Sequence, residues 1–404
     1  MGKRAIVLIL DSLGVGVMDD IKPDRLQDEG ANTFKHILDQ ASVIHIPQLE
    51  WLGINHILHH PRLAPPSQQP QASYGTLKLQ HTGADSYAGH QEIMGTAPKK
   101  PLMQPFVENI SQVKQALKQR NYRVTIPDAA LPYLLVNDVV VIADNIETDY
   151  GQIYNVTAPL DRIEFADVLR IGEVVRSKVR VSRVIALGGK NVSPEQIIAS
   201  IERRDDGLVG VNSPKSGVYE QRYQARHLGY GVDPRKQIST ILTEAGKDVT
   251  LIGKMQDVIT CDDADKYPAI ETDRVMQTIV EQMNRMEEGL IAATVQETDL
   301  AGHAQNVDRY AEKIMIVDRY LEKIIAQMTA DDLLMISADH GNDPTIGHSQ
   351  HTREKTFLLA YGKSLNSVDL GERDTLSDIA ATAADYLEVS APDNGKSFYA
   401  KLID

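Results

Sequence analysis

The chain has few cysteines, no long apolar runs and no excess of positive charge, and each shortage excludes a class of protein. Cys261 is the single cysteine, which rules out an intramolecular disulfide and a metal cluster held by cysteines. No stretch approaches the roughly eighteen uninterrupted apolar residues that predict a transmembrane helix. The formal net charge of −14 leaves no general basic surface for nucleic acid or anionic membranes.

The composition that remains is typical of a globular protein with room for two domains. The chain has 404 residues, of which 42 % are hydrophobic and 24 % charged. The apolar run at residues 5–10 is too short for a signal peptide, and Asp11 ends it without a small-residue cleavage site. We therefore expect a cytoplasmic enzyme.

Strand-like and helical patterns alternate in the outer parts of the chain. The patterns of buried strands are at 5–10, 249–253, 290–295, 333–337 and 357–361, and those of helices at 272–286, 307–328 and 376–387. This alternation predicts an α/β fold in which a mostly parallel sheet is covered by helices on both faces.

The pattern of predicted helices and strands changes near residue 100. The middle part has helical patterns at 107–119 and 165–179 and strand-like runs at 136–144 and 184–187. We expect residues 1–100 and 221–404 to form a metal-binding catalytic core domain, and residues 101–220 to form an inserted α+β cap domain.

Acids and histidines follow three of the predicted strands at the point where each ends. They are Asp11, Asp299 with His303, and Asp339 with His340, and the loop after the last pair adds His348 and His351. Because the carboxyl ends of parallel strands meet at one edge of a sheet, these groups can come together. Carboxylates with imidazoles suit Zn²⁺, Mn²⁺ or Fe²⁺, and the oxygen-rich set favours Mn²⁺.

Each of these residues has a simpler interpretation when it is taken alone. A single acid such as Asp11 is more often a helix N-cap or a turn residue. His348 or His351 alone would more often be a surface histidine, and Asp299 with His303 would form a local hydrogen-bonded pair. An Asp–His pair after two successive strands, together with a third acid, favours the metal site.

Ser86 is the candidate nucleophile. It lies in a turn before a possible helix, where backbone N–H groups favour a phosphate. A hydroxyl bound to a metal loses its proton more readily and can attack phosphorus. A simple N-cap role fits the local sequence equally well.

Several of these motifs resemble those of phosphopentomutases, which belong to the alkaline phosphatase superfamily. The matching stretches are 9–16, 85–95, 253–254, 339–345 and 351–354. They cover both ends of the chain well and the predicted cap poorly. The resemblance implies an alkaline-phosphatase-like core with a cap that closes over a sugar phosphate.

The resemblance also implies two bound Mn²⁺ ions, with Zn²⁺ as another candidate metal. The first ion would have as ligands Asp11, Ser86, Asp339 and His340. The second ion would have as ligands Asp299, His303 and His351. His348 has no part in this set. Ser86 would carry the phosphoryl group, which would make the chain a phosphoprotein.

The family interconverts the 1-phosphate and the 5-phosphate of ribose or deoxyribose, which implies a place in nucleoside and pentose phosphate metabolism. The expected partner is therefore a small sugar phosphate, with no nucleic acid and no membrane, while the oligomeric state stays open. Lys254, Arg222 and Arg226 are candidate substrate-binding residues, because cationic side chains at these positions suit a phosphate.

Two positions differ from most phosphopentomutases. Ser86 replaces their threonine, and Asp299 lies four rather than five residues before His303. Both features resemble the cofactor-independent phosphoglycerate mutases. The leading hypothesis is thus a phosphopentomutase-type enzyme. The alternatives are a phosphatase, a phosphodiesterase or a phosphoglycerate-mutase-like enzyme with the same site, and a non-catalytic metal-binding relative.

Overall fold

The chain forms two compact units in the computed structural model, which describes residues 2–21, 25–67, 69–148 and 150–403. Unit 1 comprises Met1–Pro98 and Asp233–Asp404, and unit 2 comprises Lys99–Val232. The second border lies beyond residue 221, where the sequence had placed it. The reason is strand β11 (Gln224–Gly229), which pairs with β8 (Arg183–Gly189) and so belongs to the sheet of unit 2.

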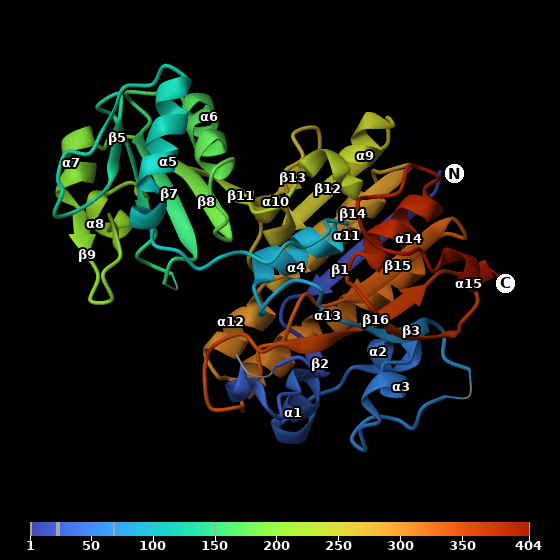
Figure 1. Ribbon diagram of the computed structural model, residues 1–404. Helices are drawn as coiled ribbons and strands as arrows, with labels where there is room; N and C mark the ends of the chain where they lie inside the picture. Colours follow the sequence, from blue (N-terminus) through green and yellow to red (C-terminus); the bar gives the residue numbers. More distant parts are fainter. Residues whose placement is uncertain (1, 22–24, 68, 149, 404) are drawn as a thin grey trace. The chain divides into compact units, whose positions relative to one another are not determined.

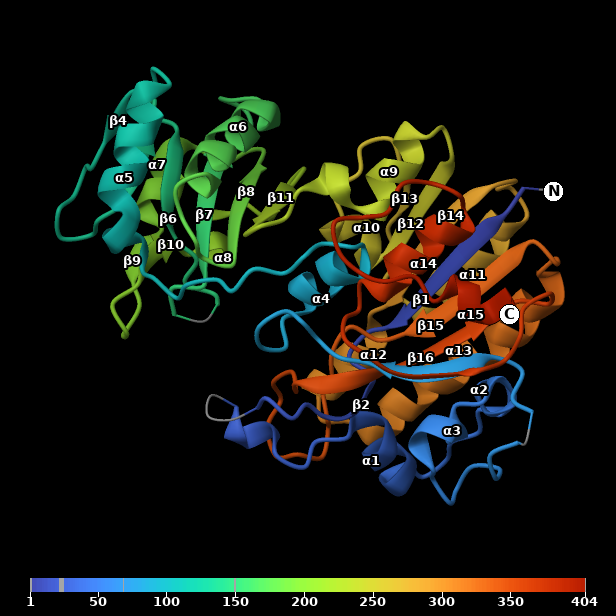
Figure 2. The ribbon, with the colours of Figure 1, turned by 45° about the vertical axis from the view of Figure 1, so that its right-hand side comes forward.

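Unit 1 is built on a sheet that has nine strands among the described residues, in the order β13–β12–β14–β1–β15–β16–β3–β17, with β2 paired to β16. The strands are β1 (Arg4–Leu10), β2 (Gly14–Val17), β3 (Ser73–Leu77), β12 (Asp248–Gly253), β13 (Asp265–Tyr267), β14 (Gly289–Val295), β15 (Asp332–Ser337), β16 (Glu354–Tyr361) and β17 (Asp369–Arg373). The block from β13 to β15 is parallel, whereas β16 is antiparallel to both β15 and β3. Figure 2 shows β1, β15 and β16 running through the middle of this sheet.

Helices cover both faces of this sheet because successive residues of its strands point to opposite sides. Ile6 and Leu8 pack with α1 (Thr33–Gln40), α2 (Pro47–Leu52), α11 (Thr272–Met283) and α13 (Val307–Gln327). Ala5 and Val7 pack with α4 (Ser86–Ile93), α9 (Ile238–Glu244), α10 (Lys254–Val258), α14 (Asp378–Tyr386) and α15 (Tyr399–Ile403). This arrangement confirms the predicted α/β class (Figure 1). Among the described residues, no helix is both long and apolar enough to cross a membrane.

Unit 2 has its own sheet of six strands within its described residues, in the order β11–β8–β7–β6–β5–β4. The remaining strands are β4 (Val124–Thr125), β5 (Leu134–Val136), β6 (Val140–Asp144) and β7 (Ile153–Pro159). Helices α5 (Phe106–Gln119) and α6 (Phe165–Arg176) pack on one face of this sheet, and α7 (Pro194–Ala199) packs on the other. Unit 2 therefore has a hydrophobic core of its own.

The prediction of one strand over 136–144 was wrong. Asn137 and Asp138 have φ angles of 52° and 60° and form the turn of a hairpin between β5 and β6. The loop spans residues 137–139, and the N–H of Val139 donates to the carbonyl of Val136, so the two left-handed residues are the central pair of a turn. Asn and Asp tolerate this left-handed conformation. The apolar run on both sides had hidden this turn.

Candidate metal centre

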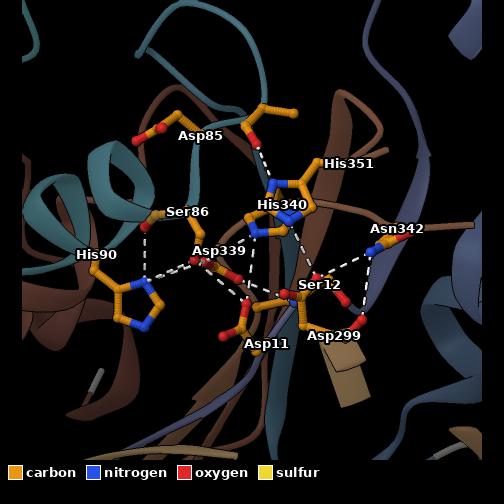
Figure 3. Close-up of polar contacts among 12 residues, drawn as sticks. Asp11, Ser12, Asp85, Ser86, His90, Asp299, Asp339, His340, Asn342 and His351 are labelled. Atoms are coloured by element: carbon orange, nitrogen blue, oxygen red, sulfur yellow. Dashed lines mark hydrogen bonds and ion pairs between the residues drawn. The ribbon is translucent and has the colours of Figure 1, made fainter. Parts of the chain in front are cut away.

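The seven predicted metal ligands all lie in unit 1, at one edge of its sheet. The register pairs Leu10 with Val295 and Ile9 with Ser337, so β1, β14 and β15 end side by side. The ligand positions follow these ends: Asp11 after β1, Asp299 and His303 in α12 (Glu297–His303), and Asp339 and His340 after β15. Ser86 is the first residue of α4, and His351 precedes β16. The structure thus brings these side chains together (Figure 3).

The first group is centred on Asp339, which is fully buried. Its Oδ2 accepts a hydrogen bond from the Ser86 hydroxyl at 2.6 Å, and its Oδ1 accepts one from the backbone N–H of Ser12 at 3.0 Å. The Ser86 Oγ also lies 3.4 Å from Asp11 Oδ1. Ser12 has a left-handed backbone, with φ of 68°, and this conformation turns its N–H toward Asp339.

The second group is centred on Asp299. Its Oδ2 lies 3.3 Å from His303 Nε2, and its Oδ1 lies 3.3 Å from His351 Nε2. Asn342 donates an amide hydrogen to Asp299 Oδ1 at 3.0 Å. Both carboxylate oxygens of Asp299 therefore have fixed neighbours.

His340 lies within reach of both groups. Its Nε2 is 3.5 Å from Asp11 Oδ1 and 3.3 Å from Asp339 Oδ2. Its ring also stacks on His351 at a centroid distance of 4.0 Å, and its ligand atom lies within 4.8 Å of those of Asp299 and His351. The family resemblance had placed His340 on the first ion alone.

His348 lies outside both groups. Its Nε2 is 3.3 Å from the carbonyl oxygen of Gln27 and 3.6 Å from Asp28 Oδ1.

The hydrogen bonds of three histidines test whether this centre suits a metal. In each, Nδ1 lies 2.7 or 2.8 Å from a backbone carbonyl; the pairs are His303 with Ser349, His340 with Gly341, and His351 with Ala84. A carbonyl only accepts, so each Nδ1 carries the hydrogen and each Nε2 is left to bind a cation. The Nε2 of His340 is buried without a hydrogen-bond partner, and those of His303 and His351 face each other at 3.0 Å. The donor set therefore fits a divalent cation.

Positive charge on neighbouring histidines holds down the pKa values of two acids of the centre. Burial alone would raise the pKa of Asp339, but the charges of His340 and His90 in their protonated forms outweigh it and hold this pKa well below its usual range. Burial also opposes ionisation of Asp299, yet hydrogen bonds from protonated His303 and His351 hold its pKa well below the usual range. A divalent cation can supply the same positive charge while each Nε2 is unprotonated.

Two glycines let helices approach the turn that follows β15. A Cβ on Gly89 of α4 would lie 2.8 Å from the carbonyl oxygen of Asp339. A Cβ on Gly302 of α12 would lie 2.6 Å from the Asn342 side chain. Asp85 caps α4 by accepting from the N–H of Ala88 at 2.8 Å, which places Ser86 in the first turn of the helix.

The candidate substrate-binding residues divide between the two units. Lys254 begins α10 in unit 1, and its Nζ lies 2.7 Å from Asp11 Oδ2. Burial lowers the pKa of Lys254, but the neighbouring carboxylates, with Asp11 first, outweigh it and raise this pKa. Arg226 lies in β11 of unit 2 and Arg222 in the loop before it, so their part in a substrate site stays a prediction.

Three residues that contact the candidate ligands were missed from the sequence: Ser12, His90 and Asn342. All three lie inside or beside the stretches that resemble phosphopentomutases. The spacing of His90, four residues after Ser86 on a predicted helix, was the one local signal available for it. The contacts of Ser12 and Asn342 join distant parts of the chain.

A sheet whose parallel strand ends bring buried carboxylates and imidazoles to a helix-terminal serine defines a metal-dependent enzyme of the phosphoryl-transfer class. The family model of the metalloenzyme superfamily matches residues 3–391, and the chain belongs to this superfamily. It is 30% identical to the phosphopentomutase of Acetivibrio thermocellus over 410 residues, which cover 99% of this chain and 100% of that one. It is 27% identical to the phosphopentomutase of Kosmotoga olearia over 424 residues, again covering 99% and 100%.

These full-length relatives show a phosphopentomutase-like enzyme, an isomerase of the metal-dependent phosphomutase type. A solved structure of phosphoglycerate mutase from Leishmania mexicana aligns with 98% of this chain and 97% of its own. Its sequence identity is 10% and its TM-score 0.46.

Proposed function

We propose that this chain is a phosphopentomutase that interconverts the 1-phosphate and 5-phosphate of ribose or deoxyribose through phosphorylated Ser86. One observation carries the proposal. The Ser86 hydroxyl lies in the first turn of α4, 2.6 Å from a carboxylate oxygen of Asp339 and 3.4 Å from one of Asp11. Among the described residues, Ser86 is the one serine whose hydroxyl is hydrogen-bonded to both of these acids.

The residues of the centre have distinct roles in this reaction. Asp339 Oδ2 accepts the hydrogen of the Ser86 hydroxyl and orients the nucleophile. The positive end of the helix dipole at the start of α4 suits the charge of a phosphoryl group on Ser86. Phosphorylated Ser86 donates its phosphoryl group to the free hydroxyl of the sugar phosphate, so the bond from phosphorus to Ser86 Oγ breaks as a bond to the sugar oxygen forms. Ser86 Oγ then takes the phosphoryl group from the other sugar oxygen, and the proton lost by the first sugar hydroxyl ends on the oxygen that is released. Lys254 supplies a positive charge for the phosphate of the substrate.

Divalent cations, when bound, lower the pKa of a coordinated hydroxyl and neutralise charge on the transferred group. We propose two Mn²⁺ ions, because the ligands form two groups around Asp339 and Asp299 and carboxylate oxygens make up much of the set. Zn²⁺ would suit the histidines equally well. A chelator titration followed by metal analysis would determine both the metal and the count.

Unit 2 is proposed as the cap over a small sugar phosphate, with Arg222 and Arg226 as its phosphate-binding residues. The support is its separate core and its insertion between the two segments of unit 1. An arginine fork suits a phosphate with two parallel hydrogen bonds. The variants R222A and R226A should raise KM for the sugar phosphate, and unchanged KM values would contradict this role.

Phosphorus NMR of the Mn²⁺-loaded protein with a panel of phosphate esters tests the function. The panel contains ribose and deoxyribose 1-phosphates, hexose 1-phosphates and phosphoglycerates. Growth of the pentose 5-phosphate signal without inorganic phosphate is the expected result. Release of inorganic phosphate in step with substrate loss would instead show a phosphatase. Silence with every ester would support a non-catalytic metal-binding protein.

The phosphoglycerates are in the panel because a specific observation favours them as second candidates. Ser86 and the four-residue spacing of Asp299 and His303 follow the phosphoglycerate mutase pattern. In the structure this spacing puts both side chains on one side of α12, with Asp299 Oδ2 3.3 Å from His303 Nε2. Isomerisation of a phosphoglycerate in place of the pentose phosphate would decide for this alternative.

A further inference from the structure

His90 is a fully buried histidine that lies one helical turn after Ser86 in α4. Its Nδ1 lies 3.0 Å from Asp339 Oδ2 and 2.8 Å from the backbone carbonyl oxygen of Ser86. Its Nε2 lies 2.8 Å from the hydroxyl of Thr294 in β14. Figure 3 shows the ring beside Ser86, with Nδ1 turned toward Asp339. No role in the proposed reaction has been given to this residue so far.

The partners of His90 define its tautomer. A backbone carbonyl only accepts, so the Nδ1 that faces the Ser86 carbonyl carries a hydrogen. The Nε2 then accepts from the hydroxyl of Thr294. The ligand atoms of His90, Asp11 and Asp339 lie within 4.8 Å of one another, which alone would allow His90 to bind an ion. An Nδ1 that carries a hydrogen cannot bind a cation, so His90 serves as a donor.

The oxygen that His90 faces is the one that orients the nucleophile. Asp339 Oδ2 accepts from the Ser86 hydroxyl at 2.6 Å, while Asp339 Oδ1 accepts from the N–H of Ser12 at 3.0 Å. Without His90, the rotatable Ser86 hydroxyl would be the remaining hydrogen-bond donor to Oδ2, and the carboxylate would be held less firmly. A donor outside the ligand set that fixes a ligating carboxylate typically changes metal affinity by 10- to 100-fold.

We propose that His90 is a positioning residue that fixes Asp339 Oδ2 for both the cation and the Ser86 hydroxyl. This inference rests on the proposed metal-dependent function of the centre. A purely structural His90 would act from its other side, by joining α4 to β14 through Thr294. The two roles use different ring nitrogens, so they can be separated by substitution.

Substitution of His90 by asparagine or glutamine separates the two roles, because each amide replaces only one of the two ring nitrogens. The amide of Asn occupies about the place of Nδ1, so H90N keeps a donor toward Asp339. The longer Gln places its amide near Nε2, so H90Q keeps a partner for Thr294 and loses the donor. H60Q is the matched control, since His60 is equally buried and bonds to Asp39, outside the metal centre.

The experiment measures Mn²⁺ affinity of the resting full-length protein by calorimetry, with circular dichroism to verify folding. H90Q should bind Mn²⁺ about 10- to 100-fold more weakly than wild type. H90N should lose less affinity than H90Q, and H60Q should bind as wild type does. Equal losses in H90N and H90Q, or an H90Q that binds as wild type does, would overturn the inference.

Three further outcomes keep the test decisive. If H90Q does not fold, H90N decides: a loss of tenfold or more despite the retained donor would contradict the inference. A wild-type protein that binds no divalent cation would overturn the inference and the proposed function together. A protein that shows the expected order of affinities but interconverts no sugar phosphate would contradict only the proposed function.

Discussion

The candidate ligands Asp299 and Asp339 accept hydrogen bonds from neighbours outside the proposed ligand set. Asn342 holds Oδ1 of Asp299, and the N–H of Ser12 holds Oδ1 of Asp339. Because a carboxylate that is free to rotate binds a cation less tightly, these hydrogen bonds should contribute to affinity without touching the ion.

Removal of Asn342 tests this at the level of one hydrogen bond. N342A removes the donor to Asp299, and the Asn342 Oδ1 that disappears with it has no hydrogen-bond partner to leave behind. We expect Mn²⁺ affinity to fall by about tenfold or more. Calorimetric titration measures it, with N155A as a control that removes a buried amide from unit 2. An unchanged affinity in N342A would contradict the role of Asn342.

The sequence reveals the ligands better than the residues that orient them. Asp11 and Asp339 were predicted as ligands because each follows an apolar strand directly, and strand ends meet at one edge. The contacts of Asn342 and Ser12 cross 43 and 327 residues of chain, and no local pattern encodes them. The place of His340 between the two groups also depends on its ring orientation, which spacing alone does not reveal.

At the scale of elements, the centre depends on how closely α4 approaches the turn after β15. Gly89 allows this approach, because the Asp339 carbonyl oxygen occupies the space next to its Cα. Glu92 of α4 accepts from the hydroxyl of Thr375, in the segment before α14, at 2.7 Å. The position of Ser86 therefore follows from the docking of the whole helix.

The variant G89A tests this docking. A Cβ 2.8 Å from a backbone oxygen must move the helix, and Ser86 with it. We expect phosphoryl transfer to fall at least tenfold, as a displacement of about 1 Å at a catalytic group costs this much or more. Initial rates measure the effect. The control is G172A in α6, where an added Cβ meets only side chains; an equal loss in both variants would contradict the account.

A second element contact gives a prediction on pH. Asp318 of α13 accepts from the N–H groups of Gln48 and Leu49 at the start of α2, and burial raises its pKa to about 6. Since the folded-state pKa lies above the ordinary value of 3.8, the stability that it contributes is complete below that value and lost as pH rises through about 6. D318N has no such titration.

The free energy of unfolding of D318N relative to wild type should therefore increase between about pH 4 and pH 7. Urea denaturation at a series of pH values measures this difference for the metal-free proteins. A difference that is constant with pH would show that Asp318 does not titrate in this range.

Element type and the mostly parallel sheet followed from the sequence, and the direction of β16 did not. The helix predicted at 307–328 is α13, whose residues Ile314, Val317 and Leu321 are buried as their spacing predicts. The strand at 357–361 was expected in a mostly parallel sheet, but β16 is antiparallel to its neighbours. A run of buried apolar residues has the same pattern in a parallel and in an antiparallel strand, so only the pairing with neighbouring strands shows the direction.

At the scale of the whole molecule, the candidate metal centre belongs to one compact unit, and the other unit has a hydrophobic core of its own. All candidate ligands lie in unit 1, whereas unit 2 has a continuous chain, Lys99–Val232, and its own hydrophobic cluster. The sequence predicted an insertion because the pattern of predicted helices and strands changes near residue 100. The return border escaped prediction because β11 lies in a polar stretch with no strand pattern.

This separation predicts different responses to metal. The isolated segment 99–232 should unfold cooperatively with a Tm that Mn²⁺ does not change. The full-length chain should gain about 2.7 kcal/mol at a Mn²⁺ concentration one hundred times its Kd, and should lose this on chelation. Differential scanning calorimetry of both proteins, with and without Mn²⁺, measures these changes. A metal-dependent Tm of the isolated segment would contradict the assignment of the ligands to unit 1.

The phosphorylation state of Ser86 tests the central claim most directly. The full-length protein is incubated with Mn²⁺ and a pentose phosphate, quenched in acid, digested and mapped by mass spectrometry, in parallel with S86A. The account predicts one added phosphoryl group on the peptide that contains Ser86, and neither this modification nor phosphoryl transfer in S86A. An S86A protein with full activity, or a phosphoryl group on another residue, would contradict it.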